Sequence, residues 1–495
     1  MHILVVTDQH PDSLGGAQVA IRAQRASLER AGHRVSIAAP ALHRVGYEVA
    51  AADRDAYIGL SSIALTKDRE YGITWPGRRA RRELAAALAD RPAVDLVHVQ
   101  GDFWGAIIGV RAARDLGVPL VCTLHNNVDQ GTRAVTPLAP LAFAGLRAWR
   151  RLVLGRVRGN VRRGGQEFTR ANGERPVRAR GAWRYLAELT AEASVVIAPS
   201  QHFADTLTQQ GVADEVTVVR GGVDDELIDT ALALPRSPRV RPRLAWLGRM
   251  SHEKRVLEFI AAVSRSGIDA DVQLFGAGLL LGQVQDRIAA AGLGDRVKVM
   301  GPVPHAAALA ALRDADALVQ TSVGFETQGL TPFEAAALGT PTVFCDPAIA
   351  ADLSVTPAWV VGENGAGAQD TGAGAQDAGA GAADEHAADE RSAGAVAPGS
   401  GAATAVPHTA APTDAIDELA RTLRAVVTQI AATLNKEGES PAPAPAAAAA
   451  ASASAPAAAS QVRVSAEQSR RLMQSEQTKL LIGVYEEVLA EARNG

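Results

Sequence analysis

Short apolar segments alternate with segments of helical periodicity along most of this chain, and they do so in two successive series. The strand-like segments are 3–7, 34–40, 95–100, 119–125, 193–200 and 215–220, then 244–250, 271–278, 296–303, 316–322 and 341–346. Strands that alternate with helices are typical of parallel sheets with crossover connections. Because 495 residues exceed what one hydrophobic core usually supports, the two series predict an α/β fold with two doubly wound lobes.

A segment rich in proline and arginine separates the two series. The composition of this segment, Leu234–Arg243, is typical of a linker between domains. We therefore expect an N-terminal domain over residues 1–235 and a C-terminal domain over residues 242–361. The ligand-binding cleft is expected between these two lobes.

The composition changes beyond residue 361. Residues 362–413 and 437–463 are tracts of Ala, Gly, Pro and Ser with almost no large side chains to bury, so they are predicted to be disordered insertions. Residues 414–435 and 464–495 have helical spacing. We expect the first of these segments to be a helix of the C-terminal domain and the second to form amphipathic helices.

Charge and cysteine content narrow the function classes. The net charge of −4 argues against a global nucleic-acid binder. Cys122 and Cys345 fall in separate apolar segments and are interpreted as buried thiols in a reducing compartment. No stretch of the sequence approaches the ~20 apolar residues of a membrane span, and the first residues already form a predicted strand. A cytoplasmic location is therefore expected.

Two glutamates flank a predicted loop that opens into a helix. Glu326 and Glu334, with seven residues between them, belong to Val323–Pro341, which follows the apolar segment 316–322. Open α/β sheets bind ligands beyond the carboxyl ends of their strands, where a helix N-terminus offers free N–H groups to anions. Glu334 in the first helical turn would accept hydrogen bonds from vicinal hydroxyls, which suits a nucleotide sugar. The alternative is a surface loop followed by an amphipathic helix.

A second strand-to-helix turn carries two cations. The pattern of Leu244–Ile260 predicts a buried strand, a glycine turn, and a helix beginning near residue 252 or 253. Arg249 and Lys254 then lie around this one turn. Arginine offers a planar fork for phosphate oxygens and lysine a mobile point charge, so together they would neutralise a departing diphosphate.

At these residues the chain resembles a known family, the retaining, nucleotide-sugar-dependent glycosyltransferases of the GT-B architecture (glycosyltransferase family 4-like, group 1). The resemblance also rests on the first strand with its Gly-Gly loop (1–21) and on residues 198–207 and 219–227. It covers residues 1–355 and returns at 465–495. It implies two Rossmann-like domains that face each other across a cleft, with the last helix crossing back to the first lobe.

The chain departs from the pattern of this family at three positions. Thr327 and Gln328 replace the Gly-Phe that often follows the first glutamate, and Gly221 replaces the usual Asn. The motif ETQGLT at residues 326–331 most resembles the corresponding motif of diacylglycerol glucosyltransferases.

The resemblance implies a donor site built from both lobes. Arg249 and Lys254 would hold the diphosphate of the nucleotide-sugar donor. Glu326 would lie beside the transferred sugar, and Glu334 would bind the ribose hydroxyls. Glycines and main-chain donors that would contact the nucleotide or its phosphates are Gly15, Gly16, Gly276, Gly278, Gly329 and Leu330.

Polar residues after two strands of the first lobe are candidates for the acceptor side. The resemblance implies that His125 contacts the sugar or the acceptor, whereas a lone histidine at a strand end is otherwise more often structural. His98 is open to the same two interpretations. Asp102 lies in a loop where it could meet an acceptor hydroxyl as a general base. His305 and both cysteines are assigned no functional role.

The resemblance implies transfer of a hexose with retention of configuration. A double displacement would need a carboxylate nucleophile behind the anomeric carbon, and no motif presents one. Front-face attack is expected instead, with the departing diphosphate helping to deprotonate the acceptor. No cofactor and no metal are expected, because the Asp-x-Asp pairs at 53/55, 269/271 and 314/316 are interpreted as solvated turn residues.

A sequence indication of the acceptor comes from residues 147–184, which are rich in arginine. Trp149, Trp183 and Tyr185 lie among or beside these arginines. This mixture suits an anionic membrane surface, so a peripheral position at the inner face of the plasma membrane and a lipid or lipid-linked glycan acceptor are expected. A solvated loop is the alternative for this segment, and no nucleic-acid partner is expected. A soluble acceptor, or a non-catalytic nucleotide-sugar-binding scaffold, remains an alternative for the protein.

Overall fold

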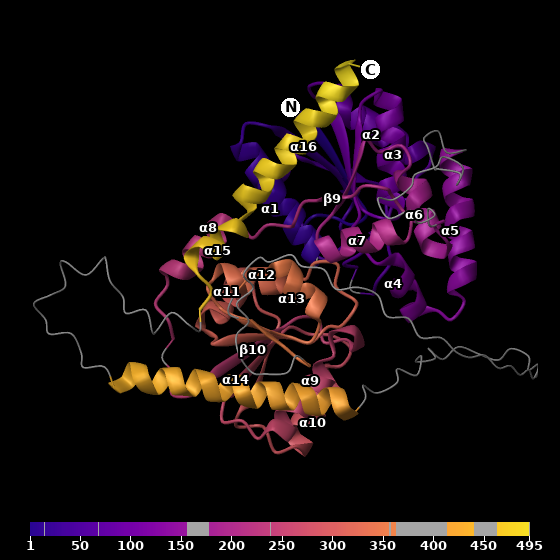
Figure 1. Cartoon of the computed structure of the whole chain (residues 1–495). Helices are drawn as coiled ribbons and strands as arrows, with labels where there is room; N and C mark the ends of the chain where they lie inside the picture. Colours follow the sequence, from indigo (N-terminus) through magenta and orange to yellow (C-terminus); the bar gives the residue numbers. More distant parts are fainter. Residues whose placement is uncertain are drawn as a thin grey trace, which may run out of the picture.

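The computed structural model describes residues 1–13, 15–67, 69–155, 178–237, 239–355, 358–362, 413–439 and 463–494. It has two α/β lobes, one above the other in Figure 1. The predicted two-lobe architecture is confirmed. The predicted insertions 362–413 and 437–463 lie, apart from their ends, outside the described residues.

The N-terminal lobe is built on a parallel sheet with the strand order β3-β2-β1-β6-β7-β8-β9. Alternate residues of β1 belong to different hydrophobic clusters, with Leu4 and Val6 on one face and Ile3 and Val5 on the other. Both faces of the sheet are therefore buried, as is usual for parallel sheets. The strands are β1 (His2–Thr7), β2 (Arg34–Pro40), β3 (Tyr57–Leu60), β6 (Leu96–Gln100), β7 (Leu120–Thr123), β8 (Val195–Ala198) and β9 (Thr217–Val218), with β4 (Ile63–Ala64) and β5 (Gly72–Ile73) as a separate hairpin.

Helices cover this sheet. They are α1 (Gly16–Arg30), α2 (Arg78–Ala89), α3 (Trp104–Leu116), α4 (Val128–Val135), α5 (Ala139–Leu154), α6 (Gly181–Thr190) and α7 (Gln201–Gln209), with the 3-10 turn η1 (Ala51–Asp53). The next helix, α8 (Asp225–Ala233), packs against the C-terminal lobe instead.

The C-terminal lobe repeats this plan with the strand order β12-β11-β10-β13-β14-β15, again parallel throughout. Its strands are β10 (Arg243–Leu247), β11 (Asp271–Phe275), β12 (Val297–Gly301), β13 (Ala317–Gln320), β14 (Thr342–Phe344) and β15 (Ala358–Val360). Its helices are η2 (His252–Lys254), α9 (Val256–Ser266), α10 (Leu281–Ala290), α11 (His305–Asp314), α12 (Leu330–Ala337), α13 (Pro347–Leu353) and α14 (Thr413–Glu439).

Buried charged residues of the C-terminal lobe hold the linker between the lobes. Asp314 and Asp316 accept hydrogen bonds from the backbone N–H groups of Ser237 (3.2 Å) and Arg243 (2.9 Å). The Arg313 guanidinium donates to three carbonyl oxygens at the end of α8 and in the linker. Because Asp314 and Asp316 are only 7% and 4% exposed, the interpretation of this pair as solvated turn residues is wrong.

The helix α15 (Ala466–Arg471) packs against α12 of the C-terminal lobe, and α16 (Gln474–Asn494) returns to the first lobe. In Figure 1, α16 lies along α1, and Tyr485 of α16 belongs to the core cluster beneath β1. The Tyr485 hydroxyl lies 2.6 Å from His98 Nδ1, and Thr123 Oγ1 lies 2.7 Å from His98 Nε2. Both ring nitrogens of His98 are thus occupied inside the core, so its role is structural.

No helix in the described ranges is both long enough and apolar enough to cross a bilayer.

Candidate active site

The strand orders place the predicted donor loops at equivalent points of the two sheets. The strand order reverses between β1 and β6 in the first lobe and between β10 and β13 in the second. Loops that leave neighbouring strands at such a point diverge and open a crevice where ligands bind. Gly15 follows β1, Lys254 follows β10 and Glu326 follows β13. All three loops therefore leave the sheets where a doubly wound fold binds its ligand.

An ion pair joins two of these loops. The Lys254 ammonium donates to the Glu326 carboxylate, which also accepts from the Ser322 hydroxyl at 2.8 Å. The side chains of Lys254 and Glu326 are 26% and 12% exposed, so the pair is partly shielded from water. Arg249 is exposed on the same loop as Lys254, and no ion pair engages it within the described part of the chain. Arg249 is thus accessible to a ligand, whereas Lys254 is paired with the Glu326 carboxylate.

The helix after the Arg249 loop begins later than the sequence predicts. His252–Lys254 form a 3-10 turn, Arg255 has a φ of 52°, and α9 starts at Val256. A residue in the left-handed region interrupts a right-handed helix. The prediction of a helix from residue 252 or 253 is therefore wrong, and Lys254 belongs to the loop instead of the helix.

Gly276 and Gly278 support the Arg249 loop by close packing. A Cβ at Gly276 would lie 2.0 Å from the Gly248 carbonyl oxygen, and one at Gly278 would lie 2.4 Å from that of Met250. The Gly248 N–H donates to the carbonyl of Phe275 at the end of β11 (3.1 Å), and the Met250 N–H donates to the carbonyl of Ala277 (2.9 Å). Both glycines are thus required for the approach of one loop to another, and their contact with a nucleotide stays a prediction.

Glu334 lies deeper in its helix than expected. After Gly329, which has a φ of 74°, α12 begins at Leu330, so Glu334 falls beyond the first turn in which it was predicted. Glu334 is 5% exposed and accepts from His305 Nε2 at 2.6 Å. This carboxylate raises the pKa of His305. His305 of α11, which is assigned no role on sequence grounds, therefore orients Glu334, the residue predicted to bind the ribose hydroxyls.

The main-chain candidates lie at the starts of two helices. Gly16 opens α1 after Gly15, and Leu330 opens α12 after Gly329. A Cβ at Gly16 would meet no atom within 4 Å, so the space beside it is open to a ligand. A Cβ at Gly221 would lie close to both Ala20 of α1 (3.1 Å) and Gln328 (2.9 Å), so α1 lies near the loop that precedes α12.

His125 lies just beyond β7, next to a buried carboxyl group. Asp102 accepts from the His125 N–H at 3.3 Å and from Asn126 Nδ2 at 2.5 Å. The Nε2 atom of His125 lies 3.2 Å from Gln100 Oε1. Burial lowers the pKa of His125 to about 4, so its imidazole is neutral near pH 7. A neutral imidazole can exchange hydrogen bonds with a sugar hydroxyl without adding charge.

Asp102 is not accessible to an acceptor hydroxyl. Its side chain is 0% exposed, and burial together with the neighbouring Asp8 charge raises its pKa to about 8. Burial raises the pKa of Asp8 to about 6, and this carboxyl group accepts from the N–H groups of Asp102 (2.6 Å) and Gly105 (2.7 Å). The two carboxyl groups order the loops after β1, β6 and β7, so the idea that Asp102 is the general base finds no support in this geometry.

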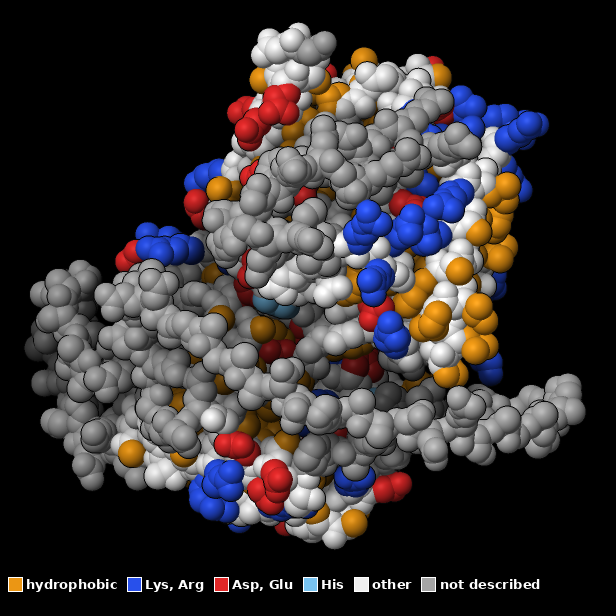
Figure 2. Space-filling model, turned by 45° about the vertical axis from the view of Figure 1, so that its right-hand side comes forward, with side chains coloured by type: hydrophobic (Ala, Val, Ile, Leu, Met, Phe, Trp, Pro, Cys, Tyr) orange, Lys and Arg blue, Asp and Glu red, His pale blue; other side chains and the backbone are white. Residues whose placement is uncertain are grey.

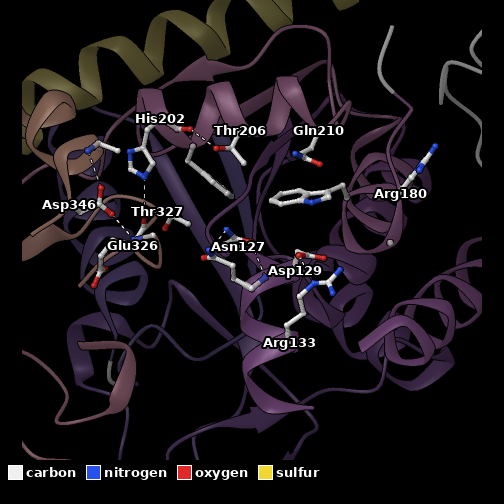
Figure 3. Close-up of a pocket in the computed structure, with 16 residues that line it drawn as sticks. Asn127, Asp129, Arg133, Arg180, His202, Thr206, Gln210, Glu326, Thr327 and Asp346 are labelled. Carbon is white, nitrogen blue, oxygen red and sulfur yellow. Dashed lines mark hydrogen bonds and ion pairs between the residues drawn. The ribbon is translucent and has the colours of Figure 1, made fainter. Parts of the chain in front are cut away.

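A cavity of about 640 Å³ lies between the lobes. Its walls come from α4, α6 and α7 and from the loops after β13 and β14. In Figure 3, Glu326 and Asp346 lie on one side of it, and Asp129 and Arg133 approach from another. Of the predicted site residues, Glu326 alone lines the cavity. Glu326 therefore marks the point where the donor loops meet this cavity.

The fold uses part of the arginine-rich segment internally. Residues 156–177 lie outside the described residues. Glu188 of α6 forms ion pairs with several of the other arginines, namely Arg147, Arg150, Arg151 and Arg184. Tyr185 is fully buried and donates to the Asp102 carbonyl at 2.9 Å, and Trp149 packs against the core. These two aromatic residues do not line a membrane-facing surface, contrary to the sequence-based expectation.

No group of His, Cys, Asp and Glu side chains that could hold a metal ion occurs in the ranges that the structure describes. Metal independence stays a prediction.

Two Rossmann-like lobes that meet across a cleft, with ligand loops at both switch points, define the GT-B class of architecture. Residues 14–227 match Glycosyltransferase Family 4, and residues 235–356 match Glycosyl transferases group 1. The chain therefore belongs to the glycosyltransferases that join these two domains.

Solved structures share this fold. HepE from Anabaena, in complex with UDP and glucose, has a TM-score of 0.55 and 15% identity, covering 98% of this chain and 100% of that chain. A glycosyltransferase from Rickettsia africae has a TM-score of 0.54 and 13% identity, covering 99% and 98%.

Sequence relatives match parts of the chain. A 2-deoxystreptamine N-acetyl-D-glucosaminyltransferase from Streptomyces fradiae is 27% identical over 51% of this chain and 54% of its own length. A phosphatidyl-myo-inositol mannosyltransferase from Mycobacterium leprae is 27% identical over 28% of this chain and 37% of its own length. The chain thus spans less than two thirds of the length of these relatives.

Proposed function

We propose that this protein transfers a hexose from a nucleotide-diphosphate sugar to an acceptor, with retention of configuration. The observation that carries this proposal is the convergence of the β10 and β13 loops in the Lys254–Glu326 pair, at the switch point of the C-terminal sheet. Glu334, fixed by His305, lies on the helix that follows the same loop. One loop and its helix thus offer ligands for both the sugar and the ribose of the donor.

The proposed reaction is a front-face displacement. Arg249 and Lys254 take up the negative charge that develops on the departing diphosphate, and the diphosphate accepts the proton of the attacking hydroxyl. In this scheme the donor diphosphate replaces Glu326 as the partner of Lys254, which leaves Glu326 free for the hydroxyls of the transferred sugar. His125, which is neutral, supplies a hydrogen bond on the side of the first lobe. No metal or cofactor takes part in this scheme.

The cavity beside Glu326 is the proposed acceptor site. Polar side chains such as Asp129, Arg133 and Gln210 line its first-lobe wall, together with the Trp183 indole. Hydroxyl groups of a sugar or cyclitol fit such a wall, because they both donate and accept hydrogen bonds. The lining therefore suits a polyhydroxylated acceptor group, either on a lipid or free in solution. The named acceptors of the two relatives, phosphatidyl-myo-inositol and 2-deoxystreptamine, represent these two cases.

The exposed face of α5 favours the lipid case. Leu138, just before α5, and Leu141 and Leu152 within it are 62%, 68% and 80% exposed, at spacings that place them along one side of the helix. Figure 2 shows apolar side chains in a band on this lobe with cationic side chains beside them. Arg151 and Arg184, about half exposed, lie near this face. An apolar strip flanked by arginines is the pattern of an interfacial helix on anionic lipid.

We expect the double substitution Leu141→Glu and Leu152→Glu to weaken binding to anionic vesicles at least about tenfold, because each change places a carboxylate where an apolar side chain would enter the interface. Flotation with phosphatidylglycerol-containing vesicles measures this. Leu480→Glu, at a 55% exposed position on α16, is the matched control and should bind like the unaltered protein. If the double variant floats as well as this control, α5 is not the membrane contact and the soluble-acceptor alternative gains.

The proposed activity is tested with a panel of nucleotide-diphosphate sugars, each incubated with the purified full-length protein with and without anionic vesicles. We expect consumption of one donor, release of its nucleoside diphosphate, and an α-linked product from an α-linked donor. Stimulation by vesicles would favour the lipid acceptor, and activity without them would favour a soluble one. A protein that binds a nucleotide sugar but consumes none would instead fit the scaffold alternative.

A further inference from the structure

Three consecutive residues of the loop between β13 and α12, residues 326–328, form hydrogen bonds with the N-terminal lobe. The Glu326 carbonyl accepts from His202 Nε2 at 2.9 Å, at the start of α7. The Thr327 carbonyl accepts from the Ser200 hydroxyl, and the Thr327 hydroxyl donates to the His125 carbonyl at 2.7 Å. The loop is therefore fixed to the ends of β7 and β8 of the N-terminal sheet.

Gln328 extends this attachment to the segment after β9. The Gly221 N–H donates to Gln328 Oε1 at 2.9 Å, and Gln328 Nε2 donates to the Gly221 carbonyl at 2.8 Å. The side-chain amide thus forms with one backbone residue the reciprocal pair that two strands form in a sheet. Gln328 is 8% exposed, so this pair is largely shielded from water.

The two partners are also two of the three positions where this chain departs from the pattern of its family. A Cβ at Gly221 would lie 2.9 Å from Gln328 Oε1 and 3.1 Å from the Ala20 Cβ. Any larger side chain at Gly221 would therefore push the Gln328 amide out of place. Glycine at 221 thus leaves room for the reciprocal bonds with the Gln328 amide, which is consistent with a common task of the two residues.

We propose that Gln328 and Gly221 form a latch between the lobes that positions the Glu326 loop for transfer. The role of that loop rests on the proposed function. Gln328 is a positioning residue, because its amide contacts backbone of the other lobe and not the reacting groups. When the lobes separate, both partners exchange their mutual hydrogen bonds for bonds to water, so the latch opens at a small net cost.

This latch makes closure of the lobes and assembly of the site a single event. The Glu326 carboxylate meets Lys254 within the C-terminal lobe, while the backbone of the same residue is held by His202 of the N-terminal lobe. When the lobes separate, residues 326–328 lose their hydrogen bonds to the N-terminal lobe but keep their contacts within the C-terminal lobe. A donor can then bind to the open C-terminal lobe, but transfer needs the latched state.

We expect Gln328→Ala to lower kcat about tenfold, since two hydrogen bonds of ordinary net strength correspond to a factor of this size. The KM for the nucleotide sugar should change little, because the donor ligands Arg249, Glu334 and Lys254 remain. Hydrogen exchange of the peptide covering residues 322–330, measured on the ligand-free full chain, should become faster. Gln429→Ala removes a glutamine that accepts a hydrogen bond from Trp359 within the C-terminal lobe, and serves as the matched control.

A double-mutant cycle tests whether the pair acts as a unit. Gly221→Ala alone should speed exchange of the 322–330 peptide, whereas in the Gln328→Ala background it should add little. Gln328→Asn, whose amide is one methylene too short to reach Gly221, should repeat the effect of Gln328→Ala if that variant folds poorly. Additive effects of the two single changes, or exchange and kcat equal to those of Gln429→Ala, would overturn the latch. The exchange measurement needs no substrate, so it judges the latch even if no nucleotide sugar is turned over.

Discussion

Replacement of Lys254 by alanine should lower kcat/KM for transfer by about 10²- to 10³-fold, the usual cost of removing one group that stabilises transition-state charge. Lys254 is the cation closest to the loop of Glu326, and its removal also leaves that carboxylate with the Ser322 hydroxyl as its described partner. Initial rates with the donor found in the panel measure the loss. Lys254→Arg should recover part of it, because the charge returns without the point-like geometry of an ammonium.

Lys479→Ala, which removes a 70% exposed lysine from α16, is the control for loss of one positive charge. If Lys254→Ala keeps more than half of the activity of this control, the diphosphate is held elsewhere. Arg249, exposed on the same loop, would then be the first residue to replace.

Replacement of Glu326 by alanine should abolish measurable transfer while nucleoside diphosphate still binds. Glu326 lines the cavity, whereas the proposed nucleotide ligands Arg249, Lys254 and Glu334 stay in place in this variant. Transfer assays and calorimetry with the nucleoside diphosphate released in the panel measure the two effects separately. Glu326→Gln keeps the shape and an acceptor for Ser322, so a comparable loss in this variant would assign the effect to the charge.

Glu467→Ala is the matched control, because it removes a 76% exposed carboxylate from α15. Transfer by Glu326→Ala at the rate of this control would exclude Glu326 from the reaction centre. Loss of nucleotide binding together with transfer would instead place Glu326 among the nucleotide ligands.

The architecture was accessible from sequence because it depends on local periodicity. Strand-like segments and helical spacing fix the succession of elements, and parallel strands with crossovers leave few arrangements. The predicted donor loops were placed correctly at strand ends for the same reason. Local signals failed where one residue alters the backbone: Arg255 takes a left-handed conformation, and this delays the helix that the pattern placed at residue 252 or 253.

Long-range pairings had no signal in the sequence. His305 and Glu334 meet because α11 and α12 pack side by side, and His98 meets Tyr485 across 387 residues. Asp316 looked like part of a solvated turn, because nothing local shows that the linker covers it. The departures at Gln328 and Gly221 were visible in the sequence, but their reciprocal contact required the folded chain.

The return of α16 to the first lobe sets an order for folding during synthesis. Tyr485, Leu481 and Val488 complete the cluster that contains Ile3 and Val5 of β1, so the core of the N-terminal lobe includes residues from α16. The C-terminal lobe, whose sheet is contained within residues 243–360, can fold on the ribosome before that end emerges. A chain cut before residue 474 would keep both sheets and expose an apolar groove beside α1. Such truncated chains are expected to be recognised by chaperones and proteases, because apolar residues of β1 and α1 that α16 covers would be exposed.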